Sequence, residues 1–164
     1  MKDWDQPNVQ IPARMLRDPG HFLSLGGGAG LIPWAPGTWG SLVGVALFLA
    51  LSGLGPGMYW TTVVVLALIG IPLCGRTGRA IGTTDPGAIV WDEIVGVLVT
   101  LGISGAGLSN IVGGFCFFRL LDIVKPWPIG MLDTRLKGGL GVMADDLAAG
   151  ALAGLAILSL RYLS

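Results

Sequence analysis

Long apolar runs separated by short linkers rich in Gly and Pro dominate this chain. Linkers such as GLGPG at 53–57 and GISGAG at 102–107 are typical of turns between antiparallel helices. Each run is shorter than the roughly 20 residues that a bilayer core requires, so some helices would need flanking residues to span, and one could be re-entrant. The pattern predicts an all-α protein, a polytopic membrane bundle of about four to five short helices. The predicted apolar segments are 40–54, 58–74, 88–104, 107–124 and 146–162.

The composition supports a membrane setting. Of the 164 residues, 52% are hydrophobic and only 12% are charged, whereas about 25% of the residues of a soluble domain are charged. The length predicts one domain over 1–164, with an N-terminal cytoplasmic segment at 1–25 and a helical membrane core over about 26–162. The start of the chain has no apolar core of signal-peptide length, so we expect it to be retained. The net charge is zero and the basic residues are scattered, which argues against nucleic-acid binding.

The basic residues predict an orientation. Arg76 and Arg79 follow the second apolar segment, and Lys125, Arg135 and Lys137 follow the fourth, while the loops after the first and third contain neither Lys nor Arg. By the positive-inside rule, the N-terminus and both charged loops are cytoplasmic. This orientation brings the polar motifs GTWGS, DPGAIVWDEIVG, RLLDIVKPWPI and GGLGVMADD to the same membrane face. A cytoplasmic-facing active site would explain their shared location.

Five carboxylates interrupt the apolar segments. A charged side chain at a bilayer centre costs roughly 2.5–3.5 kcal/mol, so these groups must lie near an interface, pair with Arg or Lys, or surround a cation. Two acidic pairs on facing helices supply the hard oxygen ligands that Mg²⁺ prefers. Gly96, Gly150 and Gly154 place small residues beside these pairs, which lets helices approach closely. We expect the Mg²⁺ ligands to be Asp92, Glu93, Asp145 and Asp146.

Helix capping is the alternative interpretation of part of this set. Asp85, Asp145 and Asp146 lie near predicted helix starts, where the helix dipole favours anions. Capping does not explain both acidic pairs together, so the metal hypothesis is preferred for the pairs.

Arg119, Asp122 and Lys125 recur every three residues at the end of the fourth segment, before Pro126 ends the predicted helix. One interpretation is an intrahelical salt bridge that reaches toward the interface. The other is a phosphate clamp, in which Arg119 or Lys125 binds the anion and Asp122 completes the metal site. Two cations against five carboxylates leave a negative surplus that a divalent metal would reduce.

The segment GGGAGLIPWAPGTWGS at 26–41 is rich in Gly but lacks the Lys of a P-loop, which argues against a nucleotide-binding fold. Its backbone N–H groups near 37–41, with the hydroxyls of Thr38 and Ser41, can bind phosphate oxygens. An N-cap with Trp34 and Trp39 as interfacial anchors is an equal alternative.

Several phosphatase classes are excluded by what the chain lacks. His21 is its only histidine, which we expect at the surface, so a mechanism with two catalytic histidines is impossible. Cys74 and Cys116 are expected to be buried structural thiols, and neither has the Arg spacing of a Cys-phosphatase loop. DxDxT and CDP-alcohol transferase motifs are also missing. Carboxylates with a metal remain as the means of phosphate chemistry.

Four ordered blocks carry a resemblance to a known family: PWAPGTWGS at 33–41, DPGAIVWDEIVG at 85–96, FRLLDIVKPWPI at 118–129 and KGGLGVMADDLAAG at 137–150. They resemble the signature blocks of phosphatidylglycerophosphatase A and cover about a third of the chain, with Ala144 as the one apolar departure. The resemblance implies an all-helical, Mg²⁺-dependent lipid phosphatase of the bacterial inner membrane that converts phosphatidylglycerophosphate to phosphatidylglycerol and phosphate. Carried over by position, its key residues are Thr38, Ser41, Asp85, Asp92, Glu93, Arg119, Asp122, Lys125, Asp145 and Asp146.

We expect Asp92, Asp122, Asp146 and Lys125 to act in catalysis, with Asp122 as a further metal ligand or as the general base, and with Thr38, Ser41, Arg119 and Lys125 binding the phosphate. Water attack on phosphorus and a covalent aspartyl-phosphate remain open. Two other classes are considered: a cation transporter or channel, whose charges would be distributed through the membrane, and a structural or partner-binding membrane protein, in which the carboxylates would be dispensable.

Overall fold

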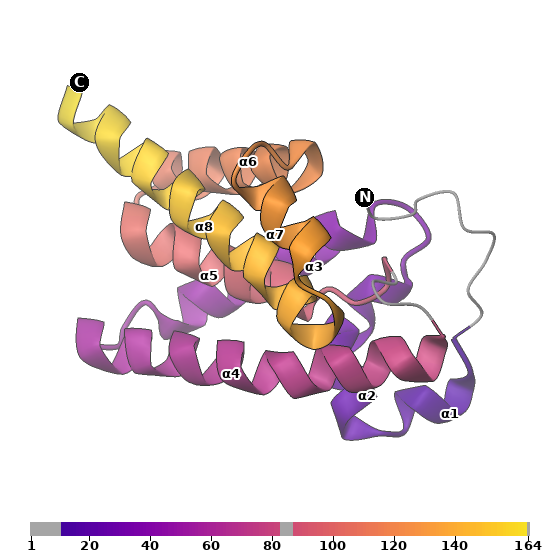
Figure 1. The fold of residues 1–164 in the computed structure, drawn as a ribbon. Helices are drawn as coiled ribbons and strands as arrows, with labels where there is room; N and C mark the ends of the chain where they lie inside the picture. The colour runs from indigo at the N-terminus through magenta and orange to yellow at the C-terminus, as the bar shows by residue number, and fades with distance from the viewer. Residues whose placement is uncertain (1–10, 83–86, 164) are drawn as a thin grey trace.

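A computed structural model describes residues 11–82 and 87–163, and all regular secondary structure in these ranges is helical. The predicted all-α class is therefore confirmed. Five longer helices form the body of the protein: α3 (Pro36–Leu51), α4 (Pro56–Ile81), α5 (Trp91–Ser104), α6 (Leu108–Val124) and α8 (Gly138–Leu163). Shorter elements precede or join them: α1 (Ala13–Leu16), α2 (Pro19–Ser24), the 3-10 helix η1 (Gly26–Leu31) and α7 (Ile129–Arg135) (Figure 1).

Two helices are longer than their apolar runs. α4 and α8 each contain 26 residues, so the prediction of uniformly short segments was wrong for them. The helices continue beyond the apolar runs, with α4 passing through Arg76 and Arg79, and α8 beginning in the glycines that precede Asp145. By length and composition, two helices could cross a membrane, 56–81 and 138–162, and α3 is a shorter apolar helix. The number of spans remains a prediction.

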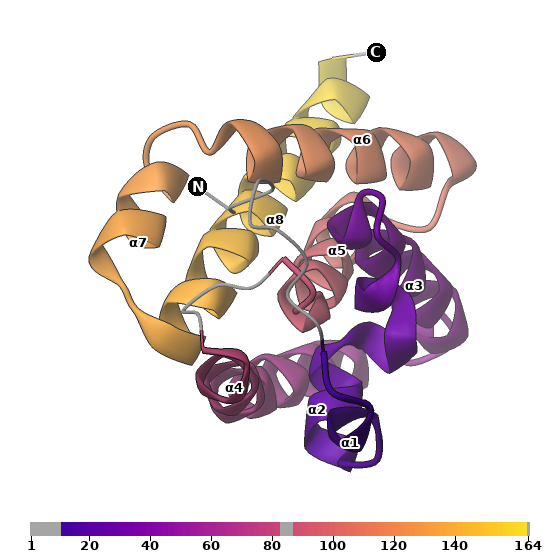
Figure 2. The same cartoon turned by 90° about the vertical axis from the view of Figure 1, so that its right-hand side faces the viewer.

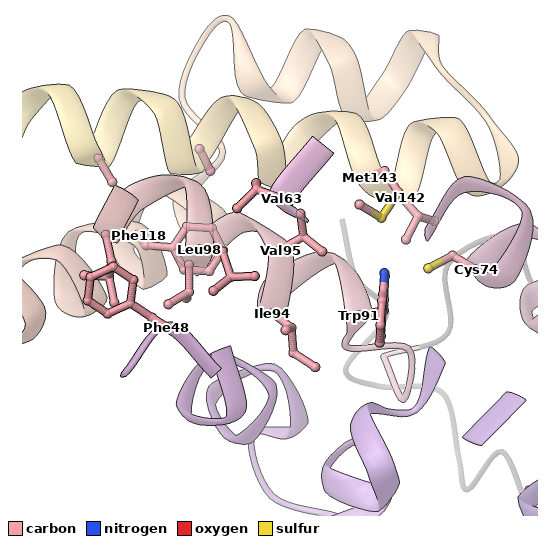
Figure 3. Close-up of a cluster of buried hydrophobic side chains, with 14 of the residues drawn as sticks. Phe48, Val63, Cys74, Trp91, Ile94, Val95, Leu98, Phe118, Val142 and Met143 are labelled. Carbon is pink, nitrogen blue, oxygen red and sulfur yellow. The ribbon is translucent and has the colours of Figure 1, made fainter. Parts of the chain in front are cut away.

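α5 is the central helix. It contacts α3, α4, α6 and α8, and α8 crosses over it (Figures 1 and 2). Eleven of its 14 residues are buried. Around it lies one hydrophobic cluster that includes Phe48 of α3, Trp91 and Leu98 of α5, Phe118 of α6 and Met143 of α8 (Figure 3).

Glycines set the distance between α5 and α8. A Cβ atom on Gly150 would lie 2.4 Å from the carbonyl oxygen of Gly96, and one on Gly154 would lie 2.8 Å from that of Thr100. The Thr100 hydroxyl donates hydrogen bonds to the carbonyls of Gly96 (2.9 Å) and Gly150 (3.2 Å). These contacts confirm the predicted role of Gly150 and Gly154 in close packing, and they bring the acidic ends of both helices together.

The outer surface carries many exposed apolar side chains, while most of the acidic residues of the four polar motifs are buried. Large exposed apolar surfaces on a soluble monomer are rare, so this distribution agrees with a hydrocarbon environment. The exposed apolar residues of the long helices include Leu42, Leu49, Val64, Leu68, Ile69, Val112, Leu120, Ile123, Leu155 and Leu160.

Two sequence expectations were wrong. His21 is buried, because α2 packs on α4 and the His21 Nδ1 lies 2.9 Å from the Thr77 hydroxyl. Cys116 is exposed on the outer surface of α6, whereas Cys74 is buried as expected. An apolar run does not indicate which face of its helix points outward, so the burial of one cysteine could not be predicted from the run alone.

Candidate active site

Three carboxylates from two helices form a compact buried cluster. Asp92 and Glu93 lie in the first turn of α5, where the helix dipole stabilises negative charge, and Asp146 lies on α8. One oxygen from each can be chosen so that all three lie within 4.8 Å of one another. Each residue is 1% exposed. A set of hard carboxylate oxygens at this spacing fits a divalent cation such as Mg²⁺, so the residues present suit the metal that the sequence predicts.

Asp145 has a different environment. Its Oδ2 accepts a hydrogen bond from Lys125 Nζ (2.5 Å), and the same ammonium donates to Asp133 Oδ1 of α7 (2.6 Å). The capping interpretation of Asp145 and Asp146 is wrong, because α8 begins at Gly138, about two turns earlier. Asp145 therefore positions Lys125, which ends α6 in a left-handed conformation.

Arg119 is buried together with Asp122 at the next turn of α6. Arg119 Nη1 donates to Asp122 Oδ2 at 2.5 Å, and Arg119 as a whole is 7% exposed. The pair is intrahelical, as one interpretation expected, but it is buried rather than directed toward solvent. The Nε–H of Arg119 is also buried and has no hydrogen-bond partner within the described ranges. A buried donor in this state is costly unless a ligand satisfies it.

The first turn of α3 closes one side of the site. Gly37 lies so close to it that an added Cβ atom would be 2.5 Å from Glu93 Oε1 and 2.9 Å from Arg119 Nη1. Thr38 follows at a half-buried position in the same turn. Ser41 is buried one turn further along, and its hydroxyl donates to the carbonyl of Gly37 (2.7 Å) within the helix.

Four distant sequence motifs therefore meet at one end of the helix bundle: the starts of α3 and α5, the end of α6 and the N-terminal part of α8. Asp85, the remaining predicted site residue, lies outside the described residues. Sequence reasoning missed Asp133, which no motif or periodicity marks. It named the backbone of residues 37–41 as a candidate for phosphate binding, but it did not predict the close approach of Gly37 to Glu93 and Arg119.

The fold and site define an all-helical protein with apolar outer faces, a buried carboxylate cluster and two adjacent buried or half-buried cations. Residues 22–161 match the family model for phosphatidylglycerophosphatase A. The chain is 41% identical over 149 residues to the phosphatidylglycerophosphatase A of Haemophilus influenzae, covering 90% of this chain and 91% of that protein. It is 40% identical over 139 residues to the Escherichia coli protein of the same name, covering 84% and 80% of the two chains.

A third relative carries a different name. A putative phosphatidylinositol-3-phosphatase of Bacteroides thetaiotaomicron is 34% identical over 149 residues, which covers 86% of this chain and 92% of that protein. No solved structure gives a significant match. The chain belongs to the phosphatidylglycerophosphatase A family.

Proposed function

We propose that this protein hydrolyses phosphatidylglycerophosphate to phosphatidylglycerol and inorganic phosphate, with Mg²⁺, at the cytoplasmic face of a bacterial inner membrane. The observation that carries the proposal is the buried Asp92–Glu93–Asp146 cluster beside the Arg119–Asp122 pair. Family membership supports the choice of substrate, because two relatives are named for it. The name of the third relative makes phosphatidylinositol 3-phosphate the competing lipid substrate to test.

Asp92, Glu93 and Asp146 would hold the metal. When bound, Mg²⁺ would supply Lewis acidity, which lowers the pKa of water and neutralises phosphoryl oxygens. Asp122 accepts from Arg119, so its role in our proposal is to hold the guanidinium in place, with the general base or a further metal ligand as its second possible role. The three ligands come from the α5–α8 contact, and the metal would therefore join the two helices.

Arg119 is the residue we propose to bind the terminal phosphate. Its buried Nε–H has no protein partner within the described ranges and suits a phosphoryl oxygen. Lys125 adds a second positive charge, fixed by Asp133 and Asp145. In the direct mechanism, water would attack phosphorus and give a proton to a site carboxylate, the bond from phosphorus to the glycerol oxygen would break, and that oxygen would take a proton from a protonated site group or from solvent.

A small cavity offers a place for the rest of the headgroup. It has a volume of about 220 Å³ and lies between α7 and the start of α8, where Asp133 and Lys137 contribute to its lining. Asp133 also contacts Lys125 (2.6 Å), so the cavity adjoins the phosphate-binding cations. Charged groups in this position can hydrogen-bond the glycerol hydroxyls and would select the headgroup, while acyl chains lie along the apolar helix faces.

The multi-pass arrangement is part of this proposal. The end of α4 packs on the start of α8 at Gly75 and Gly139, and Lys125 after α6 pairs with Asp145 of α8, so these basic ends lie near the carboxylate site. By the positive-inside rule this end would be cytoplasmic. A cytoplasmic site suits a lipid precursor made on that side of the membrane. Reaction of introduced single cysteines with a membrane-impermeant thiol reagent, in intact and opened cells, tests this orientation.

The function is tested by phosphate release from phosphatidylglycerophosphate in detergent micelles, with Mg²⁺ or EDTA. We expect Mg²⁺-dependent release by the wild type and its loss in Asp92→Asn. Asp18→Asn is the matched control, since Asp18 caps α2 outside the site. No release by well-folded wild-type protein would refute the proposal, and faster hydrolysis of phosphatidylinositol 3-phosphate would change the substrate.

The stereochemistry at phosphorus separates the two open mechanisms. Direct attack of water should invert the configuration at phosphorus, which is read from the chiral thiophosphate released when an ¹⁸O-labelled phosphorothioate substrate is hydrolysed in H₂¹⁷O. Retention would indicate two successive displacements through an aspartyl-phosphate.

A further inference from the structure

α3 approaches the bundle through three glycines on one face, and only the first of them meets functional side chains. An added Cβ on Gly40 would lie 2.5 Å from Val90 Cβ, and one on Gly44 would lie 2.9 Å from the carbonyl oxygen of Ile94. Those neighbours belong to the backbone or to a β-branched side chain held at the start of α5. These two glycines therefore serve helix packing.

Gly37 is different, because its neighbours are the far ends of two flexible side chains. A Cβ there would lie 2.5 Å from Glu93 Oε1, 2.9 Å from Arg119 Nη1 and 3.2 Å from Arg119 Nη2. Both neighbouring groups can swing away without moving a helix, so the fold can accept a methyl group at this position. The site cannot, because Glu93 belongs to the carboxylate cluster and Arg119 donates to the Asp122 carboxylate.

We propose that Gly37 is a positioning residue, whose bare α-carbon sets the separation between the Glu93 carboxylate and the Arg119 guanidinium. It touches neither metal nor substrate in this proposal, and it acts through those two side chains. The inference rests on the proposed function where it is tested by the kinetics of phosphate release, but not where it is tested by metal binding. It also explains why α3 begins with Pro36 and then the smallest residue, directly before Thr38.

The chain contains a matched control for Gly37→Ala. α4 also begins with Pro at its first position and Gly57 at its second, and a Cβ on Gly57 would meet nothing within 4 Å. Gly37→Ala and Gly57→Ala thus make the same change at the same helix position. The two variants differ only in what the new methyl group contacts.

The experiment measures kcat and KM for phosphatidylglycerophosphate, the Kd of Mn²⁺ as a probe of the carboxylate cluster, and the thermal midpoint. For Gly37→Ala we expect kcat/KM to fall about 10- to 100-fold, as for other misplaced catalytic groups. Mn²⁺ should bind about tenfold more weakly, as when a neighbour of a ligand is altered. The midpoint should stay within about 2 °C of the wild type. Gly57→Ala should match the wild type in every measurement.

A double-mutant cycle tests the contact itself. Glu93→Asp retracts the carboxylate by one methylene and leaves only the Arg119 contacts, so Gly37→Ala should lower kcat/KM by a smaller factor in that background than in the wild type. Equal Mn²⁺ affinity and kcat/KM in Gly37→Ala and Gly57→Ala would overturn the inference, as would an additive cycle. If the wild type releases no phosphate but binds Mn²⁺ in a manner that depends on Gly37, the inference stands and the proposed function fails.

Discussion

Binding of Mg²⁺ should stabilise the fold measurably, because the three proposed ligands come from two helices that must be packed together to form the site. Asp92 and Glu93 lie on α5 and Asp146 on α8. A ligand that binds only the folded state at a concentration of 100 Kd adds about 2.7 kcal/mol to the free energy of unfolding. For a chain of this size, each kcal/mol added to the free energy of unfolding raises the thermal midpoint by about 2–4 °C, so the midpoint should rise by about 5–10 °C.

Asp146→Asn should remove most of this shift. The amide keeps the shape of the side chain but lacks its charge. Loss of a residue that merely orients a ligand weakens metal binding by about 10- to 100-fold, so we expect the loss of a ligand's charge to cost about 100-fold. At the same Mg²⁺ concentration only RT ln 2, about 0.4 kcal/mol, would remain, so the midpoint would rise by less than about 2 °C. In EDTA the variant should be no less stable than the wild type, since one of three neighbouring carboxylates has become neutral.

Tryptophan fluorescence during heating in detergent reports the transition, because Trp91 is buried at the start of α5 beside Asp92. Each protein is measured in MgCl₂ and in EDTA, and near-UV circular dichroism confirms that both states are folded at the start. Asp18→Asn, outside the site, should keep the full shift. A shift in Asp146→Asn as large as that of the wild type would show that Mg²⁺ stabilises the protein elsewhere, and the reasoning would be refuted.

Three further predictions concern other parts of the molecule. Gly150→Ala should lower the free energy of unfolding by about 1–3 kcal/mol through overpacking, measured by denaturant unfolding in micelles. Asp133→Asn should raise KM several-fold with little change in thermal midpoint, because Lys125 loses its ion pair with Asp133 and retains its ion pair with Asp145. The pKa of Asp18 is lowered from 3.8, chiefly because the backbone N–H of His21 donates to its carboxylate. Its stabilising contribution should therefore be present above pH 3.8 and be lost as the pH falls below that value, and acid unfolding curves of Asp18→Asn should lack this component.

The sequence alone predicted the helical class and most of the residues that the structure brings together in the candidate site. Apolar runs bounded by Gly and Pro predicted the five long helices. When consecutive helices are antiparallel, every second connection between them lies at the same end of the bundle. That order is why Asp92, Lys125 and Asp146, far apart in the chain, could be expected at one end of the bundle. Charged residues inside apolar runs were the strongest signal, since each carries a cost that a site must offset.

Which acidic residue joins the carboxylate cluster and which one pairs with Lys125 could not be predicted from the sequence. Asp145 and Asp146 are neighbours, so a helix directs them about 100° apart, and only the positions of α5 and α6 decide which carboxylate joins Asp92. In the structure Asp146 does so, and Asp145 meets Lys125. The packing of the neighbouring helices determines which partner each carboxylate meets, and a local sequence motif does not contain this information.

The position of the charges along the helices bears on the competing class of function. A cation pathway would need polar groups at several depths, so that an ion passes from one partner to the next across the membrane. Here the described site carboxylates and their cations gather toward one end of α5, α6 and α8, and the second half of α5 contains no charged residue, with Val97, Leu98 and Leu101 completely buried. Next to the cluster, α5 and α8 pack closely at the Gly96–Gly150 contact. Charges gathered at one end of the helices fit the proposed lipid phosphatase better than a cation pathway, which needs polar groups at several depths.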